Sequence, residues 1–245
     1  MLGSLSRTYP ARARPKLSDQ PIVFHMPELE ELREPVAVGY IRQFFDVLGV
    51  NQNRLHFLTV PMEIDELTVF GSQFMDRIFC DTNLSRNMQA AVLAPSAPAG
   101  APAAGHAFVS RSLLEGGTND FVSDRNLDDI ARDLGFDVIH PETMTLRDQI
   151  SVFDRYLSVS GFQSSFFHLK GFCRNAGRVN ILVPEEKRTF SINFLKIDIA
   201  CGFDDRYHLV NAQRAETPRV KFQQTLKIDR ADLVDTLVRI KQAHS

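Results

Sequence analysis

The sequence lacks the features that mark a secreted, membrane-spanning or metal-binding protein. Its three cysteines, Cys80, Cys173 and Cys201, are widely spaced and form no CxxC pair, which argues against a disulfide framework and a zinc site. No apolar run approaches the roughly 18 to 20 residues of a transmembrane helix, and the first residues contain no apolar segment typical of a secretion signal. These absences predict a cytoplasmic protein that holds no metal.

The chain also lacks a large excess of either positive or negative charge. The chain has 28 basic and 30 acidic residues, so its formal net charge is only −2. Non-specific binding of nucleic acid needs a strong basic field, which this balance does not supply. We therefore do not expect nucleic acid as a partner.

Several motifs of common enzyme classes do not occur. No GxGxxG follows a strand and there is no GxxxxGK(S/T), so dinucleotide redox chemistry and P-loop phosphoryl transfer are disfavoured. The GxSxG elbow of α/β-hydrolases is missing. No Asp-x-Asp pair is evident that would hold a divalent ion under a diphosphate. A diphosphate ligand would therefore have to be neutralised by arginine and by a helix N-terminus.

The first part of the 245-residue chain has little regular pattern. Residues 1–35 are rich in proline and carry scattered basic side chains, which predicts a flexible arm. Those basic side chains suit either peripheral contact with acidic lipid or a solvated tail. Residues 36–93 predict a small, incomplete α/β segment, with a helix that ends at Gly49, a strand over 54–60 and a short helix through Leu84, Met88 and Val92.

A change of composition separates this part from the rest. Residues 94–105 are almost entirely alanine, proline and glycine, which cannot build a core and disfavour both helix and strand. We interpret them as a linker or a long surface loop. The domain that we expect after it spans residues 106–245.

That second domain alternates strands and helices. Apolar stripes at helical spacing separate the expected strands and end near Gly135 and Leu157, and a helix is expected from Gln163 to Gly171. A final helix is expected after Asp229 as its N-cap. Such alternation is typical of a Rossmann-like parallel sheet with helices on both faces. The four expected strands are 107–111, 136–139, 156–161 and 178–184.

In open parallel sheets, ligands bind at the carboxyl ends of the strands. Ser110 and Arg111 follow the first expected strand, and an arginine there suits a diphosphate because its guanidinium is planar and always charged. After the third strand, Gly161 permits a sharp turn and Gln163, Ser164 and Ser165 enter the first helical turn, where free N–H groups favour an anion. The sequence thus predicts a phosphate cradle at this edge.

Each of these residues also has a purely structural interpretation. Arg111 can close a surface salt bridge, and Ser164 and Ser165 can simply cap a helix. His140, with Glu142 two residues later, suits contact with a nucleobase or ribose, or a plain turn into the next helix. His168 lies further along the third helix and suits a partly buried position.

The segment from residue 106 to about 184 resembles the C-terminal lobe of glycosyltransferase family 61, which includes bacterial capsular-polysaccharide enzymes. The resemblance rests on a strand that ends in Ser-Arg, a Gly-Phe strand that leads into Pro-Glu, an acidic-Gln pair in a helix, and a glycine turn that opens the next helix. In this chain these places are held by Ser110 and Arg111, Gly135 and Phe136, Pro141 and Glu142, Asp148 and Gln149, and Gly161.

The resemblance implies an inverting, metal-independent glycosyltransferase of surface or capsular polysaccharide synthesis, with a GT-B arrangement and the donor bound on this lobe. It implies a nucleotide-sugar such as a UDP-sugar as donor, a glycan as acceptor and no further cofactor. The donor diphosphate would contact Ser110, Arg111, Gly161, Gln163, Ser164 and Ser165. Arg111 would stabilise the charge that grows on the leaving diphosphate. The candidate catalytic groups are His140, His168 and Glu142. The oligomeric state is left open.

Two other functions remain open. The family has a histidine where this chain has Gln163, and an amide cannot take up a proton. The chain is therefore also compatible with a truncated or degenerate relative that binds a nucleotide or supports an assembly without transferring sugar. The third reading is an unrelated flavodoxin-like or regulatory α/β domain.

Overall fold

The computed structural model describes residues 20–25, 42–58, 60–68, 74–75, 79–81, 104–114, 119–121, 124–173, 178–185, 191–214 and 224–243. The chain divides into two units, one of residues 1–94 with 199–201 and one of residues 95–198 with 202–245. The short helix expected through Leu84, Met88 and Val92 lies outside the described residues, as does most of the linker expected at 94–105.

In the first unit, strand β1 (Ile22–His25) pairs in parallel with β2 (Leu55–Leu58). Phe24 in β1 stacks on Phe57 with 5.3 Å between the ring centroids and meets the edge of Phe45 at 5.5 Å. Residues 22–25 lie within the range expected to be an arm, yet these aromatic contacts anchor them in a sheet.

The predicted first helix is confirmed over residues 42–47, and Gly49 ends it with a φ of 65°. A short 3-10 helix η3 (Gln52–Arg54) leads into β2. Strands β3 (Phe74–Met75) and β4 (Phe79–Cys80) form an antiparallel pair that the sequence did not predict.

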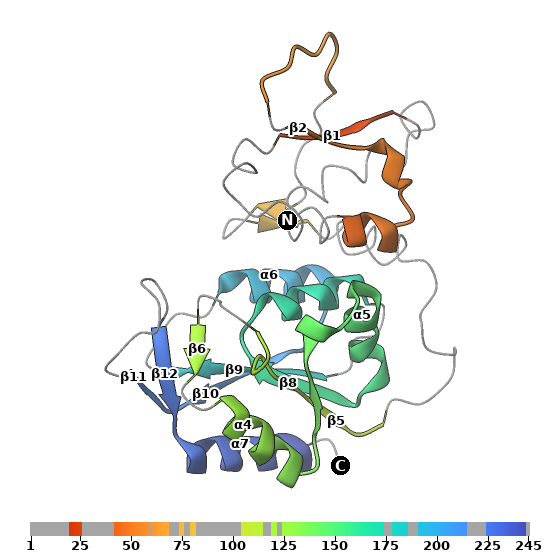
Figure 1. The fold of residues 1–245 in the computed structure, drawn as a ribbon. Coiled ribbons are helices and arrows are strands. Elements are labelled where there is room, and N and C mark those ends of the chain that lie inside the picture. The colour runs from red at the N-terminus through yellow and green to blue at the C-terminus, as the bar shows by residue number, and fades with distance from the viewer. Residues whose placement is uncertain are drawn as a thin grey trace. The chain divides into compact units, whose positions relative to one another are not determined.

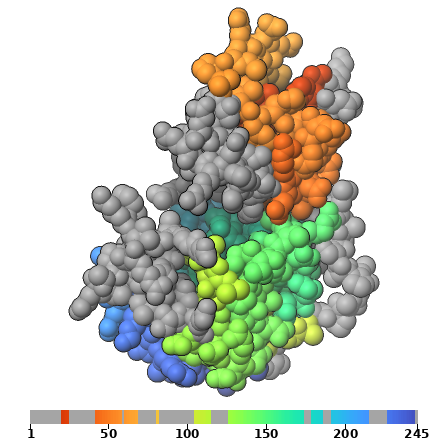
Figure 2. Space-filling view, viewed as in Figure 1, coloured from red at the N-terminus to blue at the C-terminus, as the bar shows by residue number. Residues whose placement is uncertain are grey.

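Residues 60–68 come after β2 and contain neither helix nor strand. All nine are exposed, including Val60, Met62, Ile64 and Leu67, and Figure 2 shows this stretch in orange on the surface of the first unit. The strand predicted over 54–60 is therefore shorter than expected, because Pro61 and its neighbours have no partner strand among the described residues.

The second unit contains the predicted parallel sheet. Its five strands are all parallel and lie in the order β10, β9, β8, β5, β7. Counted along the chain, this is the order 2-1-3-4-5, which is the flavodoxin-like one of the two common doubly wound orders. The predicted Rossmann-like α/β architecture, a parallel sheet flanked by helices, is confirmed. The bounds are β5 (His106–Val109), β7 (Asp137–Ile139), β8 (Ser158–Phe162), β9 (Arg178–Pro184) and β10 (Arg206–Val210).

Helices cover both faces of this sheet, as predicted. Figure 1 shows α4 (Asp124–Asp133) and α7 (Arg230–Gln242) on one face, and α5 (Leu146–Arg155) and α6 (Ile192–Cys201) on the other. The first pair encloses a core in which apolar residues of the two helices pack on Phe108, Phe162, Leu182 and Val210 of the sheet. No helix in the described ranges is both long and apolar enough to cross a bilayer.

The ends of several elements follow local signals that the sequence carries. Asp229 is the N-cap of α7, and its carboxylate accepts a hydrogen bond from the Asp232 amide at 3.0 Å. Gly135 follows α4 with a φ of 78°, which suits a residue without a side chain. The helix expected over 163–171 is instead a 3-10 helix, η5 (Ser165–Phe172).

A second, three-stranded sheet was not predicted. Strand β12 (Gln224–Ile228) pairs in parallel with β6 (Asn119–Phe121) and in antiparallel fashion with β11 (Ala212–Arg214). Two of these strands have only three residues, which is too short for an alternating pattern to stand out.

A buried ion cluster joins the elements η5, α6 and β10. Lys170 of η5 is fully buried and forms salt bridges with Asp198 of α6 and Asp205, and the Tyr207 hydroxyl of β10 donates to Asp198. Two carboxylates here face a single ammonium group. Burial raises the pKa of Asp205 to about 7, against the opposing charge of Lys170 and with a further contribution from Asp198.

This pKa predicts how stability changes with pH. The Asp205 carboxyl binds its proton more tightly in the folded chain than in the unfolded chain, where its pKa has the ordinary value of 3.8. The resulting stabilisation is complete below pH 3.8 and is lost as the pH rises through about 7. We expect wild-type protein to lose more free energy of unfolding between about pH 5 and about pH 8 than Asp205→Asn does. Urea unfolding at both pH values measures this, and equal losses in the two proteins would contradict it.

Candidate functional site

The carboxyl edge of the parallel sheet brings three predicted segments together. Val109, the last residue of β5, pairs with Ile139 of β7 on one side and with Gly161 of β8 on the other. The segments that follow, 110–114, 140–143 and 163–165, therefore leave the sheet at the same edge. Between β5 and β8 the chain order reverses, and such a switch point is where doubly wound sheets bind ligands.

Gly161 lies inside β8 and not in the turn after it. A Cβ atom at this position would be 2.8 Å from the Val109 carbonyl oxygen, 3.0 Å from the Val109 Cβ and 3.2 Å from the Phe167 ring. The glycine therefore permits the close approach of β5, β8 and η5. Its observed role is packing, whereas the sequence suggested a sharp turn and close backbone approach to a ligand.

Ser110 and Arg111 occupy different environments although they are adjacent. Ser110 is buried; its amide donates to the Ile139 carbonyl at 2.8 Å and its Oγ accepts from the Ser112 amide at 3.0 Å. Arg111 is half-buried, and within the described part of the chain its guanidinium has no hydrogen bond or ion pair. The surface salt bridge that offered an alternative for Arg111 is thus not formed among these residues.

The turn after β8 leads directly into η5. The Gln163 amide continues the ladder by donating to the Leu182 carbonyl at 3.1 Å. Ser164 is the N-cap of η5, but its side chain makes no capping hydrogen bond, and its Oγ is buried without a partner among the described residues. Ser165 is exposed at the first position of the helix. The first N–H groups of a helix have no intrahelical acceptor and can serve an anion.

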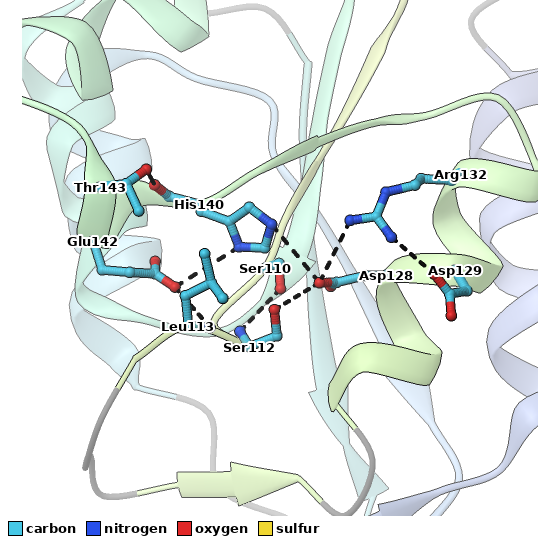
Figure 3. A network of polar contacts seen from close by, with 9 residues as sticks. All are labelled: Ser110, Ser112, Leu113, Asp128, Asp129, Arg132, His140, Glu142 and Thr143. Carbon is cyan, nitrogen blue, oxygen red and sulfur yellow. Dashed lines mark hydrogen bonds and ion pairs between the residues drawn. The ribbon is translucent and has the colours of Figure 1, made fainter.

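A polar network links the β5 loop to α4 and to the turn after β7. Figure 3 shows Ser112 and His140 directed at the Asp128 carboxylate from two sides. Ser112 Oγ donates to Asp128 Oδ2 at 2.6 Å, and His140 Nε2 lies 3.8 Å from the same oxygen. Arg132 reaches Asp128 at 3.9 Å and Asp129 at 2.8 Å.

His140 and Glu142 lie together in this network. The Glu142 Oε1 atom is 3.8 Å from His140 Nδ1 and accepts a hydrogen bond from the Leu113 amide at 3.1 Å. Thr143 Oγ1 donates to the His140 carbonyl at 2.8 Å and closes the turn, whose residues Pro141–Thr143 form the short 3-10 helix η4. The structure therefore combines the plain turn with a side-chain cluster, and the two interpretations of His140 are not exclusive.

His168 is not part of this cluster. Its ring stacks on Phe194 of α6 with 4.6 Å between the ring centroids, and the residue is half-buried in η5. The three catalytic candidates thus separate into a pair, His140 and Glu142, and one residue that packs on a helix. This agrees with the partly buried position that the sequence also suggested for His168.

Sequence reasoning missed Ser112 and Asp128. A signal for Asp128 was present, because it precedes Ala131 by three residues and so shares the face of α4 that the stripe of Leu127, Ile130 and Ala131 buries. A carboxylate at such a position calls for a polar partner. Its side chain is only 4% exposed.

Neither a family model nor a curated protein matches this chain. Over the described ranges, no group of three or more His, Cys, Asp or Glu side chains is arranged to hold a metal ion. The site is accordingly defined by its own geometry, with a guanidinium, a helix start and a carboxylate-histidine cluster around the buried Asp128 at one sheet edge.

The packing role of Gly161 leads to a prediction about stability. In Gly161→Ala the new methyl group must push β5 or Phe167 away, so the free energy of unfolding should fall by roughly 1–3 kcal/mol. The neighbouring Ser160→Ala is the matched control, because Ser160 Oγ is buried without a partner among the described residues and its loss should cost little. Urea unfolding of both variants measures the difference. A Gly161→Ala protein as stable as wild type would exclude the tight packing.

Proposed function

We propose that this chain is an inverting, metal-independent glycosyltransferase that binds a nucleotide-sugar donor at the carboxyl edge of β5 and β8. The acceptor is a glycan of surface or capsular polysaccharide. The observation that carries the proposal is the pairing of Val109 with Gly161, because it puts the loop with Arg111 and the start of η5 at one edge of the sheet.

The charges at this edge support an anionic ligand. Arg111 makes no ion pair among the described residues and is only half-buried, so its planar, permanently charged guanidinium is available to an anion at this edge. The uncapped start of η5 adds N–H donors and the buried Ser164 hydroxyl. A diphosphate offers the negative charge and the several acceptor oxygens that this set of donors requires.

In a nucleotide-sugar transfer the leaving group is the nucleoside diphosphate. The bond between the sugar anomeric carbon and the diphosphate oxygen breaks while the acceptor oxygen bonds to that carbon and loses its proton. Arg111 would stabilise the charge that develops on the diphosphate, which lowers the barrier without a metal. His140 and Glu142 are the candidates for accepting the proton, since they follow β7 at the same edge.

A nucleotide-binding module without transferase activity is the second candidate. Gln163 follows β8 where the resemblance implies a histidine, and an amide can donate and accept hydrogen bonds but cannot carry a proton. This candidate predicts binding of UDP without turnover. The transferase predicts that UDP is released from the donor when an acceptor glycan is present.

The donor site can be tested by removing the Arg111 guanidinium. Titration of UDP and of UDP-sugars by calorimetry should give binding to wild type, and Arg111→Ala should weaken it about 10- to 100-fold through loss of charged hydrogen bonds. Arg155→Ala is the matched control, because Arg155 ends α5 at the opposite, amino edge of the sheet and should leave the affinity unchanged. If UDP and UDP-sugars bind no better than a control dinucleotide such as NAD, the donor site does not exist.

Gln163→His separates the two candidate functions. If the missing imidazole is what limits proton transfer, this variant should release UDP from a UDP-sugar at least tenfold faster than wild type, within the range for one general acid-base group. A coupled assay for free UDP measures the rate, with Gln163→Asn as the control that keeps an amide. Equal rates in all three proteins would show that the amide does not limit turnover.

A further inference from the structure

The loop that carries Arg111 has two kinds of hydrogen bond. Within the loop, the Ser112 amide donates to Ser110 Oγ at 3.0 Å and the Leu114 amide donates to the Arg111 carbonyl at 3.0 Å. These local bonds shape residues 110–114 into a turn. They do not by themselves attach that turn to the rest of the domain.

Attachment comes from two carboxylates on different elements. Ser112 Oγ donates to Asp128 of α4 at 2.6 Å, and the Leu113 amide donates to Glu142 of η4 at 3.1 Å. The side chains of Asp128 and Glu142 are only 4% and 14% exposed. Two anchors from separate elements restrain the turn against rotation about either one of them.

His140 lies between the two anchors. Its Nε2 is 3.8 Å from Asp128 Oδ2 and its Nδ1 is 3.8 Å from Glu142 Oε1. These distances are too long for hydrogen bonds, so the ring acts on both carboxylates as a nearby polar group and, when protonated, as a shared cation. Figure 3 shows the ring directed between the two carboxylates.

The Asp128 carboxylate is retained at a cost to stability. Its second oxygen, Oδ1, is buried and has no hydrogen-bond partner among the described residues. A buried polar atom in that state is unfavourable, and an apolar side chain on this face of α4 would avoid it. What Asp128 provides in return is the short hydrogen bond to the Arg111 loop.

We propose that Asp128 and Glu142 are positioning residues, which fix the 110–114 loop so that the Arg111 side chain leaves the backbone from a fixed point at the sheet edge. This inference rests on the proposed function, because the ligand of Arg111 is taken to be a diphosphate. Fixing the loop backbone in advance reduces the conformational entropy that binding would otherwise cost.

The experiment removes each anchor without touching Arg111. Ser112→Ala deletes the hydroxyl that reaches Asp128, and Glu142→Ala deletes the acceptor of the Leu113 amide. Each variant should bind UDP roughly 2- to 12-fold more weakly, the range for one side chain that must be ordered on binding. Asp128→Asn should retain most of the affinity, because its amide oxygen can still accept from Ser112.

Two further measurements separate positioning from a general loss of structure. In an Arg111→Ala background, Ser112→Ala and Glu142→Ala should cause no additional loss of UDP affinity, since their effect runs through the guanidinium. Without ligand, hydrogen exchange of the Leu114 amide, measured by NMR, should be faster in both variants. Neither substitution removes the hydrogen bond from the Leu114 amide to the Arg111 carbonyl, so faster exchange would report a looser loop. Thr143→Ala is the matched control. It deletes the hydrogen bond from Thr143 to the His140 carbonyl, which lies in the turn that carries Glu142 but does not reach the 110–114 loop.

The outcomes distinguish this inference from the proposed function. Additive losses in the Arg111→Ala background, or an unchanged Leu114 exchange rate, would overturn the positioning role. If wild type binds no UDP, the donor site fails, and faster Leu114 exchange in the two anchor variants would still support the anchoring of the loop. Equal effects in Thr143→Ala would show a general loosening and would also overturn the inference.

Discussion

The close approach of β5 and β8 at Gly161 is the constraint on which the candidate site depends. No side chain larger than hydrogen fits there, because a Cβ would lie 2.8 Å from the Val109 carbonyl oxygen and 3.2 Å from the Phe167 ring. In the observed register, Val109 faces Gly161. The positions at which the Arg111 loop and η5 leave the sheet follow from that register, so the site inherits its geometry from strand packing.

The cations Lys170 and Arg111 differ in whether a carboxylate in the described part of the chain neutralises them. Inside the domain, Lys170 is matched with Asp198 and Asp205, which joins η5 to α6 and to the segment before β10. At the open edge, Arg111 has no such partner among the described residues, while the nearby carboxylates of Asp128 and Glu142 are engaged with the loop itself. Lys170 is thus paired within the fold, whereas Arg111 has no such partner in the described ranges, and the proposed function assigns its guanidinium to an anionic ligand.

The strands and helices of the second unit could largely be predicted because their signals are local. Apolar residues at helical spacing indicated α4 and α5, Asp229 indicated the start of α7, and β9 was predicted with its observed bounds. The short strands of the second sheet carry no comparable pattern. The 3-10 form of η5 was also missed, because Phe166, Phe167, Leu169 and Phe172 are all buried and leave no amphipathic stripe to read.

The sequence by itself determined the parallel sheet, the helices α4, α5 and α7 that cover it and the approximate places of four of its strands, since periodicity, capping and turn residues act over a few positions. Only the tertiary structure decided that Ser112, Asp128, His140 and Glu142 form one network and that Gly161 serves packing. These residues come from separate elements, and their contacts depend on which strands lie side by side. Strand order is fixed by long-range packing, which no local pattern in the chain records.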